Sequence, residues 1–99
     1  MPYDFEWDPE KDASNWERHK VRFEEAKTVF YDSMNYELPD EEHSEDELRE
    51  TIIGHSTRQR VLRVTFTQRK NEIIRIISAR RLTKKEQKAY AELISQRGR

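Results

Sequence analysis

Residues 72–90, EIIRIISARRLTKKEQKAY, carry the clearest structural signal in this 99-residue chain. Four isoleucines within five positions are typical of a central, largely buried strand. The TKKE pattern at 83–86 fits a capping box, in which the Thr and Glu side chains bind the free amides at a helix start. Arg80 and Arg81 therefore lie where a strand ends and a helix begins. Backbone amides and guanidinium groups can together face an anion there.

Arg75 lies among the isoleucines and needs a partner, because burying an unpaired charge is unfavourable. Arg75 and Arg80 are five positions apart, so an unbroken strand places them on opposite faces. A site that both arginines share requires the strand to end or bulge near Ser78 and Ala79. If the strand stays regular, Arg75 shares a face with Arg81 instead.

Outward from this stretch, residues 60–68 alternate cleanly, with Leu62, Val64 and Phe66 on one face. Between the two segments, Asn71 can take the positive φ of a tight hairpin turn. The elements expected in this half of the chain are strands at about 48–55, 60–68 and 72–79 and a helix at about 83–96.

The N-terminal half predicts two helices. Asp8 followed by Pro9 is typical of a helix start, and this helix is expected to end near Arg18 and His19. Arg22 stands at the cap position of the second helix, where its side chain cannot accept a hydrogen bond from an amide. The apolar residues at helical spacing in the second helix are Phe23, Ala26, Val29 and Phe30. Short strands are expected at 5–7, on a sheet edge, and at 36–38.

The predicted fold class is α+β, with one domain spanning residues 1–99. A short strand and two helices precede an antiparallel meander and a closing helix, and runs of strands after helices favour this class over a βαβ sheet. Cysteine is absent, which excludes disulfides and cysteine-based metal sites. No apolar run approaches the length of a membrane span, so we expect a cytoplasmic protein with no membrane partner.

The formal net charge of −1 conceals a strong asymmetry. Residues 1–50 hold 6 Lys and Arg against 17 Asp and Glu (6 − 17 = −11), whereas residues 51–99 hold 13 against 3 (13 − 3 = +10). Such a difference indicates a face that binds a polyanion or a charged partner. The alternative is that the two halves neutralise each other in the fold.

The chain resembles the BrnT family, the toxins of type II toxin–antitoxin systems. The residues that carry the resemblance span nearly the whole chain: Phe5-Glu6-Trp7-Asp8, Lys11, Asn15, His19, Val21, Phe23-Glu24-Glu25-Ala26, His43-Ser44, Glu47, Arg49, Gly54, Arg75–Arg81, Glu86 and Tyr90. The resemblance implies a RelE-like α+β fold and an endoribonuclease that inhibits translation. It also implies a cognate BrnA-type antitoxin with a ribbon-helix-helix DNA-binding domain, through which the complex contacts DNA.

The sequence departs from the family pattern at five positions. Lys20 stands where a glycine is usual, and Arg22 where a capping serine is usual. His55 and Arg63 replace apolar residues, and Leu82 replaces a small one. The first two substitutions bear on the joint between the helices rather than on activity.

RNA cleavage without a metal uses the neighbouring 2′-OH as the nucleophile, so the protein must supply a base, an acid and cations. We expect Arg75 and Arg80 to stabilise the phosphate, because the guanidinium group suits phosphate geometry and keeps its charge. Arg81 would assist as an RNA-binding residue, although it could instead be an ordinary solvated charge. The further residues predicted to bind RNA are Arg60, Arg63 and Lys84.

His43 and Glu47 are the predicted acid and base, since histidine exchanges protons near neutral pH. Glu47 could instead pair with Arg49 or Arg75, and His43 could be a solvated loop residue. His55 is a weaker candidate, and His19 is expected only to close the first helix, where a cation is favourable. No metal site or cofactor is predicted. The alternative function is a non-catalytic protein that binds RNA or an antitoxin, that is, a degenerate toxin.

Overall fold

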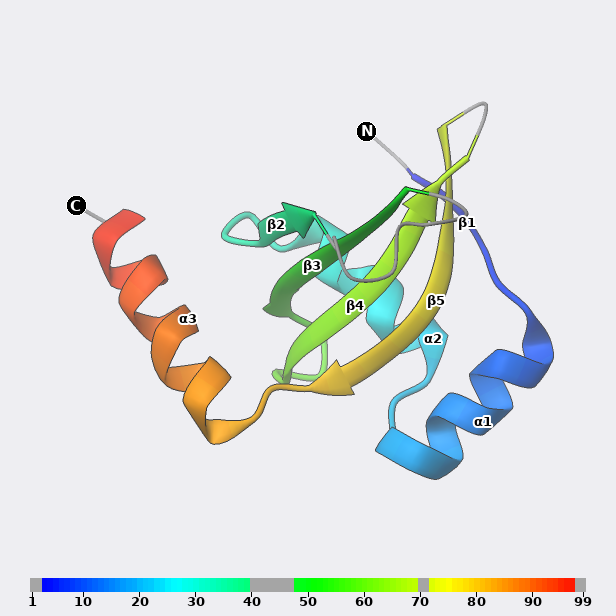
Figure 1. The fold of residues 1–99 in the computed structure, drawn as a ribbon, viewed down its shortest axis with the longest axis horizontal. Coiled ribbons are helices and arrows are strands. Elements are labelled where there is room, and N and C mark those ends of the chain that lie inside the picture. The colour runs from blue at the N-terminus through cyan, green and yellow to red at the C-terminus, as the bar shows by residue number, and fades with distance from the viewer. Residues whose placement is uncertain (1–2, 40–47, 70–71, 98–99) are drawn as a thin grey trace.

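The computed structural model describes residues 3–39, 48–69 and 72–97 and shows a five-stranded sheet in the order β1-β5-β4-β3-β2, flanked by helices (Figure 1). The strands are β1 (Asp4–Glu6), β2 (Tyr36–Pro39), β3 (Arg49–His55), β4 (Val61–Gln68) and β5 (Ile73–Arg81). The helices are α1 (Pro9–His19), α2 (Phe23–Ala26), the 3₁₀ helix η1 (Lys27–Tyr31) and α3 (Lys84–Arg97). The α+β prediction is confirmed.

Strands β2 to β5 form the predicted antiparallel meander. Strand β1 is at the sheet edge, as expected, but it pairs in parallel with β5, so the sheet is mixed. The sequence did not predict this pairing, because three residues carry no information about the direction of their partner. The second predicted helix is also shorter than expected, since the α-helical turn of α2 tightens into η1.

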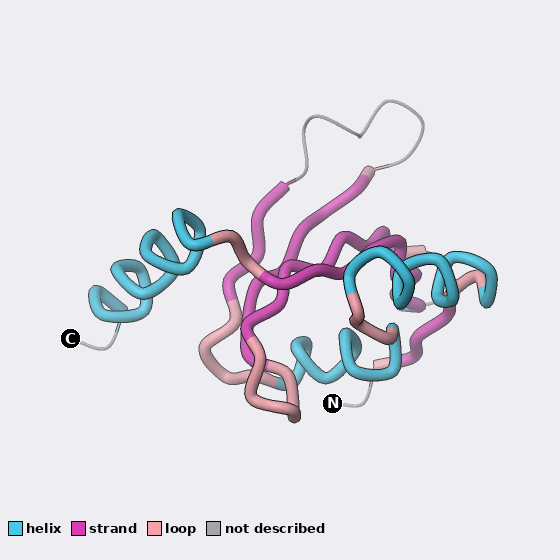
Figure 2. Tube along the Cα trace, turned by 90° about the horizontal axis from the view of Figure 1, so that it is seen from below, coloured by secondary structure: helices cyan, strands magenta, loops and turns pink. Residues whose placement is uncertain are grey.

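The two faces of the sheet are covered differently (Figure 2). Helices α2 and η1 lie against one face, where the main core includes Phe23, Phe66 and Ile76, and α1 lies beside β5. Helix α3 packs at the other side through a smaller cluster that includes Tyr90, Leu82 and Ile53. Leu62, Val64 and Phe66 all face the main core, which confirms the predicted alternation of β4. The same face also carries Arg63 of β4 and Arg80 of β5, which lie opposite each other.

A β-bulge in β5 meets the condition for placing Arg75 and Arg80 on one face. Thr65 pairs with Ser78, but Phe66 pairs with Ile76, so Ile77 is an extra residue in β5. The bulge reverses the alternation, and Ile76 and Ala79 both point into the main core. Arg75 and Arg80 therefore share the opposite face.

The joint between α1 and α2 accommodates both Lys20 and Arg22. Lys20 ends α1 in the left-handed conformation, at φ 56° and ψ 39°, a conformation that favours glycine. Arg22 makes no side-chain cap, as predicted. Asp12 supplies one instead, because its Oδ1 accepts from the Phe23 amide at 2.9 Å.

Two further sequence predictions concern single residues. Asp8 caps α1, accepting from the Glu10 amide at 2.9 Å, and Pro9 follows it, as expected. Asn71 lies outside the described residues; Glu72, which follows it, has a positive φ of 62°. Across the described ranges, the helices are too short or too polar to cross a membrane.

Candidate functional site

Arg63 and Arg80 form a cationic pair on the polar face of the sheet. They lie directly opposite each other on β4 and β5, an arrangement that is unfavourable without a counter-charge. Glu86 of α3 supplies that charge. Its carboxylate accepts from Arg80 at 2.8 Å and 3.0 Å and from Arg63 at 3.3 Å.

Glu86 also forms the predicted capping box at the start of α3. Its Oε1 accepts from the Thr83 amide at 2.9 Å, and the Thr83 hydroxyl accepts from the Glu86 amide at 3.2 Å. The hydrogen bonds from Arg80, followed by those from Thr83, lower the pKa of Glu86 from its ordinary value to about 2. Glu86 is therefore charged at neutral pH and fixes Arg80 relative to the helix.

Arg80 keeps donors available beyond these contacts. Of the five N–H groups of a guanidinium, Nη1 gives one to Glu86 and one to the Arg81 carbonyl, and Nη2 gives one to Glu86. Among the contacts of the described residues, this leaves the Nε N–H and one Nη2 N–H. These two groups suit bidentate binding of a phosphate.

Arg75 lies on the same face but belongs to a different ion pair. Its Nη1 donates to Glu6 of β1 at 2.7 Å, and Arg69 donates to the same oxygen at 3.2 Å. In the strand register, Arg75 lies opposite Thr67 of β4, and Arg80 lies opposite Arg63. Those partners are four residues apart on β4, which separates the two arginine backbones by about 13 Å. The two arginines therefore cannot bind the same phosphate oxygen without long side-chain movements.

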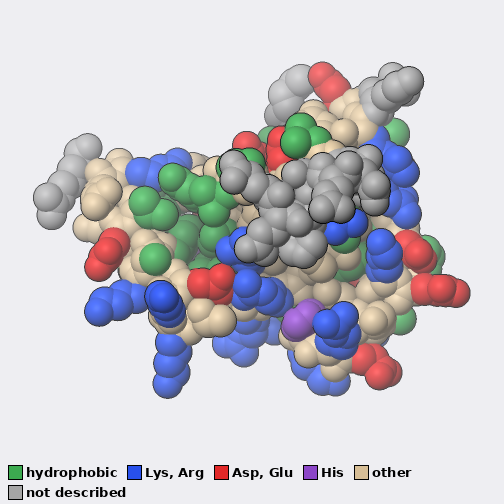
Figure 3. All heavy atoms as spheres, in the orientation of Figure 1, with side chains coloured by type: hydrophobic (Ala, Val, Ile, Leu, Met, Phe, Trp, Pro, Cys, Tyr) green, Lys and Arg blue, Asp and Glu red, His purple; other side chains and the backbone are tan. Residues whose placement is uncertain are grey.

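A second group of cations meets Arg80 from α1. Lys11, Arg18 and His19 line one side of a hollow of about 550 Å³, and Arg80, with Arg49 of β3, lines the other. We call this the basic hollow; its remaining walls are Ser14, Asn15, Ile77, Ser78 and Ala79. None of the described residues that line it is acidic. Lys and Arg side chains gather on this face over α1 and the end of β5 (Figure 3).

Asn15 holds α1 against β5 and so builds the basic hollow. Its side-chain amide donates to the Ala79 carbonyl at 2.8 Å, and its carbonyl oxygen accepts from the Ala79 amide at 3.1 Å. It also donates to the Val21 carbonyl at 2.9 Å. Asn15 thereby takes the place of a neighbouring strand beyond the end of β1.

Sequence reasoning missed the contribution of α1. Lys11, Asn15 and Arg18 follow the i, i+4, i+7 spacing of one helical face, which is the signal that could have revealed it. His19 was expected only to close the helix, whereas it also lines the basic hollow. The sequence of α1 alone does not show that β5 lies beside this face, because that contact depends on the fold.

The remaining predicted site residues lie elsewhere. Arg81 and Lys84 are exposed near the end of β5 and the start of α3. Arg60 is bound to buried Glu25, which also accepts from Ser56 at 2.7 Å. Burial raises the pKa of Glu25, but the hydrogen bonds from Arg60 and Ser56 outweigh it and lower the pKa overall. Arg60 is thus held in a structural ion pair.

The predicted acid and base, His43 and Glu47, lie outside the described residues. His55 lies at the end of β3, where its backbone amide donates to Asp32 at 2.8 Å. Within residues 3–39, 48–69 and 72–97, no three His, Asp or Glu side chains group together in a way that could hold a metal ion.

Comparison with known proteins identifies the family. Residues 7–86 match the family described as "Ribonuclease toxin, BrnT, of type II toxin-antitoxin system". The chain belongs to the BrnT family. The crystal structure of the Brucella abortus ribonuclease toxin BrnT superposes with a TM-score of 0.65 at 20% sequence identity, covering 84% of this chain and 100% of that one. The shared BrnT fold agrees with the predicted architecture. No curated protein matches the chain by sequence.

Proposed function

We propose that this BrnT-family chain is an active endoribonuclease that cleaves RNA without a metal, by attack of a 2′-OH on the adjacent phosphate. The observation that carries the proposal is the basic hollow, where Arg80 meets cations from α1 with no acid among the described lining residues. Such a surface favours a polyanion, and its hydrogen-bond donors suit the extra negative charge of a phosphorane.

Arg80 is the proposed phosphate-binding residue. Glu86 accepts one hydrogen bond from Nη1 and one from Nη2, and the Nε N–H with the second Nη2 N–H provides a fork for two phosphate oxygens. Lys11 and Arg18 are exposed on the facing helix and would bind neighbouring phosphates. Arg63 positions Glu86, and through it Arg80.

His19 is the proposed proton carrier in the basic hollow. Histidine is the side-chain type that most readily exchanges protons near neutral pH, and His19 lines the same hollow as Arg80. His43 and Glu47 remain candidates beside His19, because a cleavage reaction needs both an acid and a base. RelE-like nucleases can also work with arginine and lysine alone.

The chemistry is tested with one RNA in two forms, in the presence of EDTA. Attack by the 2′-OH predicts fragments that end in a 2′,3′-cyclic phosphate and begin with a 5′-OH. A single 2′-deoxy substitution at the cleaved nucleotide should abolish that cut and leave cuts elsewhere unchanged. Cleavage that persists at the 2′-deoxy nucleotide, or that EDTA stops, would contradict the proposed reaction.

The type II system implies an antitoxin, and we propose that a BrnA-type antitoxin with a ribbon-helix-helix domain neutralises this chain by covering Arg75 and Arg80. Both arginines lie on the polar face of the sheet. Cleavage of cellular RNA by the free toxin would then inhibit translation. Arginine modification tests the contact: Arg75 and Arg80 should react more slowly in the complex than in the free toxin. Equal reactivity in the two states would exclude this mode of inhibition.

A further inference from the structure

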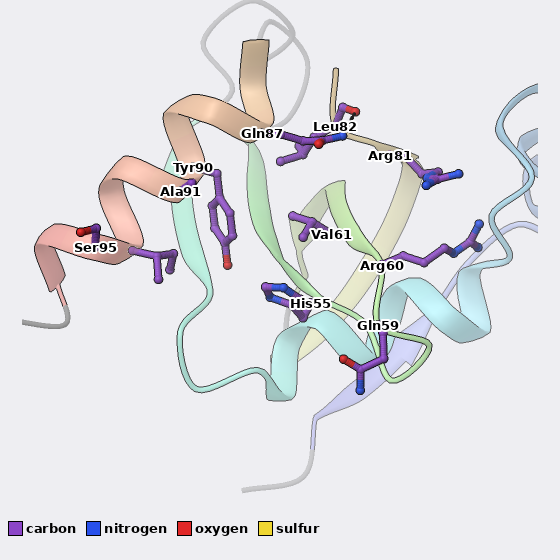
Figure 4. Close-up of a pocket in the computed structure, with 11 residues that line it drawn as sticks. His55, Gln59, Arg60, Val61, Arg81, Leu82, Gln87, Tyr90, Ala91 and Ser95 are labelled. Carbon is purple, nitrogen blue, oxygen red and sulfur yellow. Dashed lines mark hydrogen bonds between the residues drawn. The ribbon is translucent and has the colours of Figure 1, made fainter. Parts of the chain in front are cut away.

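A second hollow, of about 580 Å³, lies between α3 and the sheet (Figure 4). We call it the α3 pocket and define it by its walls, Val61, Leu82, Tyr90 and Ile94. We propose that the α3 pocket binds one nucleobase of the RNA whose phosphate lies in the basic hollow, and so sets sequence preference. This inference rests on the proposed ribonuclease function.

The shape and lining of the α3 pocket suit a flat, partly apolar group. Its volume falls within the range typical of small-molecule sites. Tyr90 is 6% exposed, and its ring stands against the sheet, with its hydroxyl directed toward His55 (Figure 4). Single-stranded RNA is commonly recognised by stacking unpaired bases on side chains of this kind. The aliphatic side chains of Leu82 and Ile94 supply the remaining apolar contact.

Polar groups around the same pocket can read the edge of a base. Gln59 and Gln87 both line it, and each carboxamide offers paired donors and an acceptor. Gln87 is oriented by its own Nε2, which donates to the Leu82 carbonyl at 3.2 Å. This contact leaves the Gln87 carbonyl oxygen and a second N–H for a ligand. Amide groups in this arrangement make the two-point contacts that distinguish one base from another.

Charge and position link the α3 pocket to the basic hollow. Arg81 lines the α3 pocket, and Arg80, its neighbour in sequence, lines the basic hollow. No acidic residue is present among the described residues of either lining. In this arrangement one RNA strand places a phosphate at Arg80 and a nearby base beside Tyr90.

The α3 pocket lies partly within the family match, through residues such as Val61, Arg81 and Leu82, and partly beyond it. The match to the BrnT family ends at residue 86, before Tyr90, Ala91 and Ile94.

Binding of the four uncharged nucleosides tests the α3 pocket directly, because they lack the phosphate that the basic hollow would attract. Adenosine, guanosine, cytidine and uridine are each titrated into the ¹⁵N-labelled protein. At least one should shift the amide signals of Tyr90, Ala91 and Ser95, and none should shift Lys11 or Arg18. If none of the four shifts the α3 signals at millimolar concentration, the inference is wrong.

Two matched tryptophan variants on α3 strengthen this test. Ala91 is exposed and lines the pocket, whereas Ala89 is equally exposed but does not line it. Ala91→Trp should fill the pocket and weaken nucleoside binding at least fivefold, roughly the loss of one base-stacking contact. Ala89→Trp should leave binding unchanged. Equal effects of the two variants would overturn the assignment.

Cleavage of a randomised RNA pool separates this inference from the proposed function. Among the cuts that it still makes, Ala91→Trp should lose the wild-type preference for one base next to the cut. If the wild type cleaves and Ala91→Trp keeps the same preference, the inference fails while the ribonuclease function stands. If nucleosides bind but no RNA is cleaved, the ribonuclease function fails while base binding stands. Shifts of the α3 signals by the cognate antitoxin and by no nucleoside would assign the pocket to a protein partner instead.

Discussion

Lys20 shows how one backbone conformation can limit stability. An L-residue in the left-handed region is strained by about 1 kcal/mol or more, and glycine is not. Lys20→Gly should therefore unfold at a higher urea concentration than Lys20→Ala, with a free energy of unfolding about 1 kcal/mol larger. The alanine variant is the control because both substitutions remove the ammonium that lies 5.5 Å from the Trp16 ring centre. Equal stability of the two variants would show that φ at this position carries no strain.

The lowered pKa of Glu86 predicts that the stability of the fold depends on pH. Its pKa is lowered to about 2 in the folded chain, so the unfolded chain binds a proton more readily. The stability that Glu86 contributes should be complete above about pH 5 and should decrease as the pH falls toward 2. Glu86→Gln should therefore be less stable than the wild type at pH 7, with the difference shrinking across that range. Urea unfolding of both proteins at several pH values measures the difference, and a gap independent of pH would contradict this role.

At the scale of elements, the contact between α1 and β5 depends on Asn15. Asn15→Ala leaves the amide and carbonyl of Ala79 and the carbonyl of Val21 without their partner in a buried region. Each unsatisfied group costs about 1 kcal/mol or more, so the free energy of unfolding should fall by roughly 2–4 kcal/mol. Ser14→Ala, an exposed change on the same helix, is the control. Hydrogen exchange at Ala79 should accelerate in Asn15→Ala only; unchanged exchange would show that α1 does not secure β5.

The elements of this fold could be predicted from the sequence where local patterns are strong. The alternation of β4, the cap at Asp8 and the capping box at Thr83 all form as expected. The extra residue at Ile77 could be stated only as a condition, because a bulge depends on the register of the partner strand. The parallel pairing of β1 could not be predicted, since it depends on where α1 and α2 return the chain.

For the candidate site, sequence reasoning identified Arg80 but not its neighbours. Lys11 and Arg18 come from the acidic half of the chain, so the charge asymmetry directed attention away from them. Arg60 illustrates the opposite case. It comes from the basic half, but Glu25 of the acidic half neutralises it in the fold. Only the packing of the helices against the sheet distinguishes a cation available to a ligand from one that stabilises the structure.

For the whole molecule, the basic hollow predicts RNA binding that depends on salt. Binding of a 2′-deoxy-substituted strand should weaken linearly in a plot of log affinity against log salt concentration. Lys11→Ala should reduce the slope by about 0.7, the contribution of one phosphate contact to a single strand. Lys88→Ala, an exposed change on α3 that lines neither hollow, should leave the slope unchanged. Identical slopes for the two variants would place the RNA elsewhere.

The assignment of Arg80 as the phosphate-binding residue is tested most directly by cleavage of RNA in the presence of EDTA. Arg80→Ala should lower the rate by about 10²–10³-fold, the loss expected for one well-placed donor to the transition state. Arg75→Ala should have a smaller effect, because Arg75 is bound to Glu6 and lies further along the sheet. Lys88→Ala should cleave like the wild type. A folded Arg80→Ala variant that cleaves RNA as fast as the wild type would contradict the assignment.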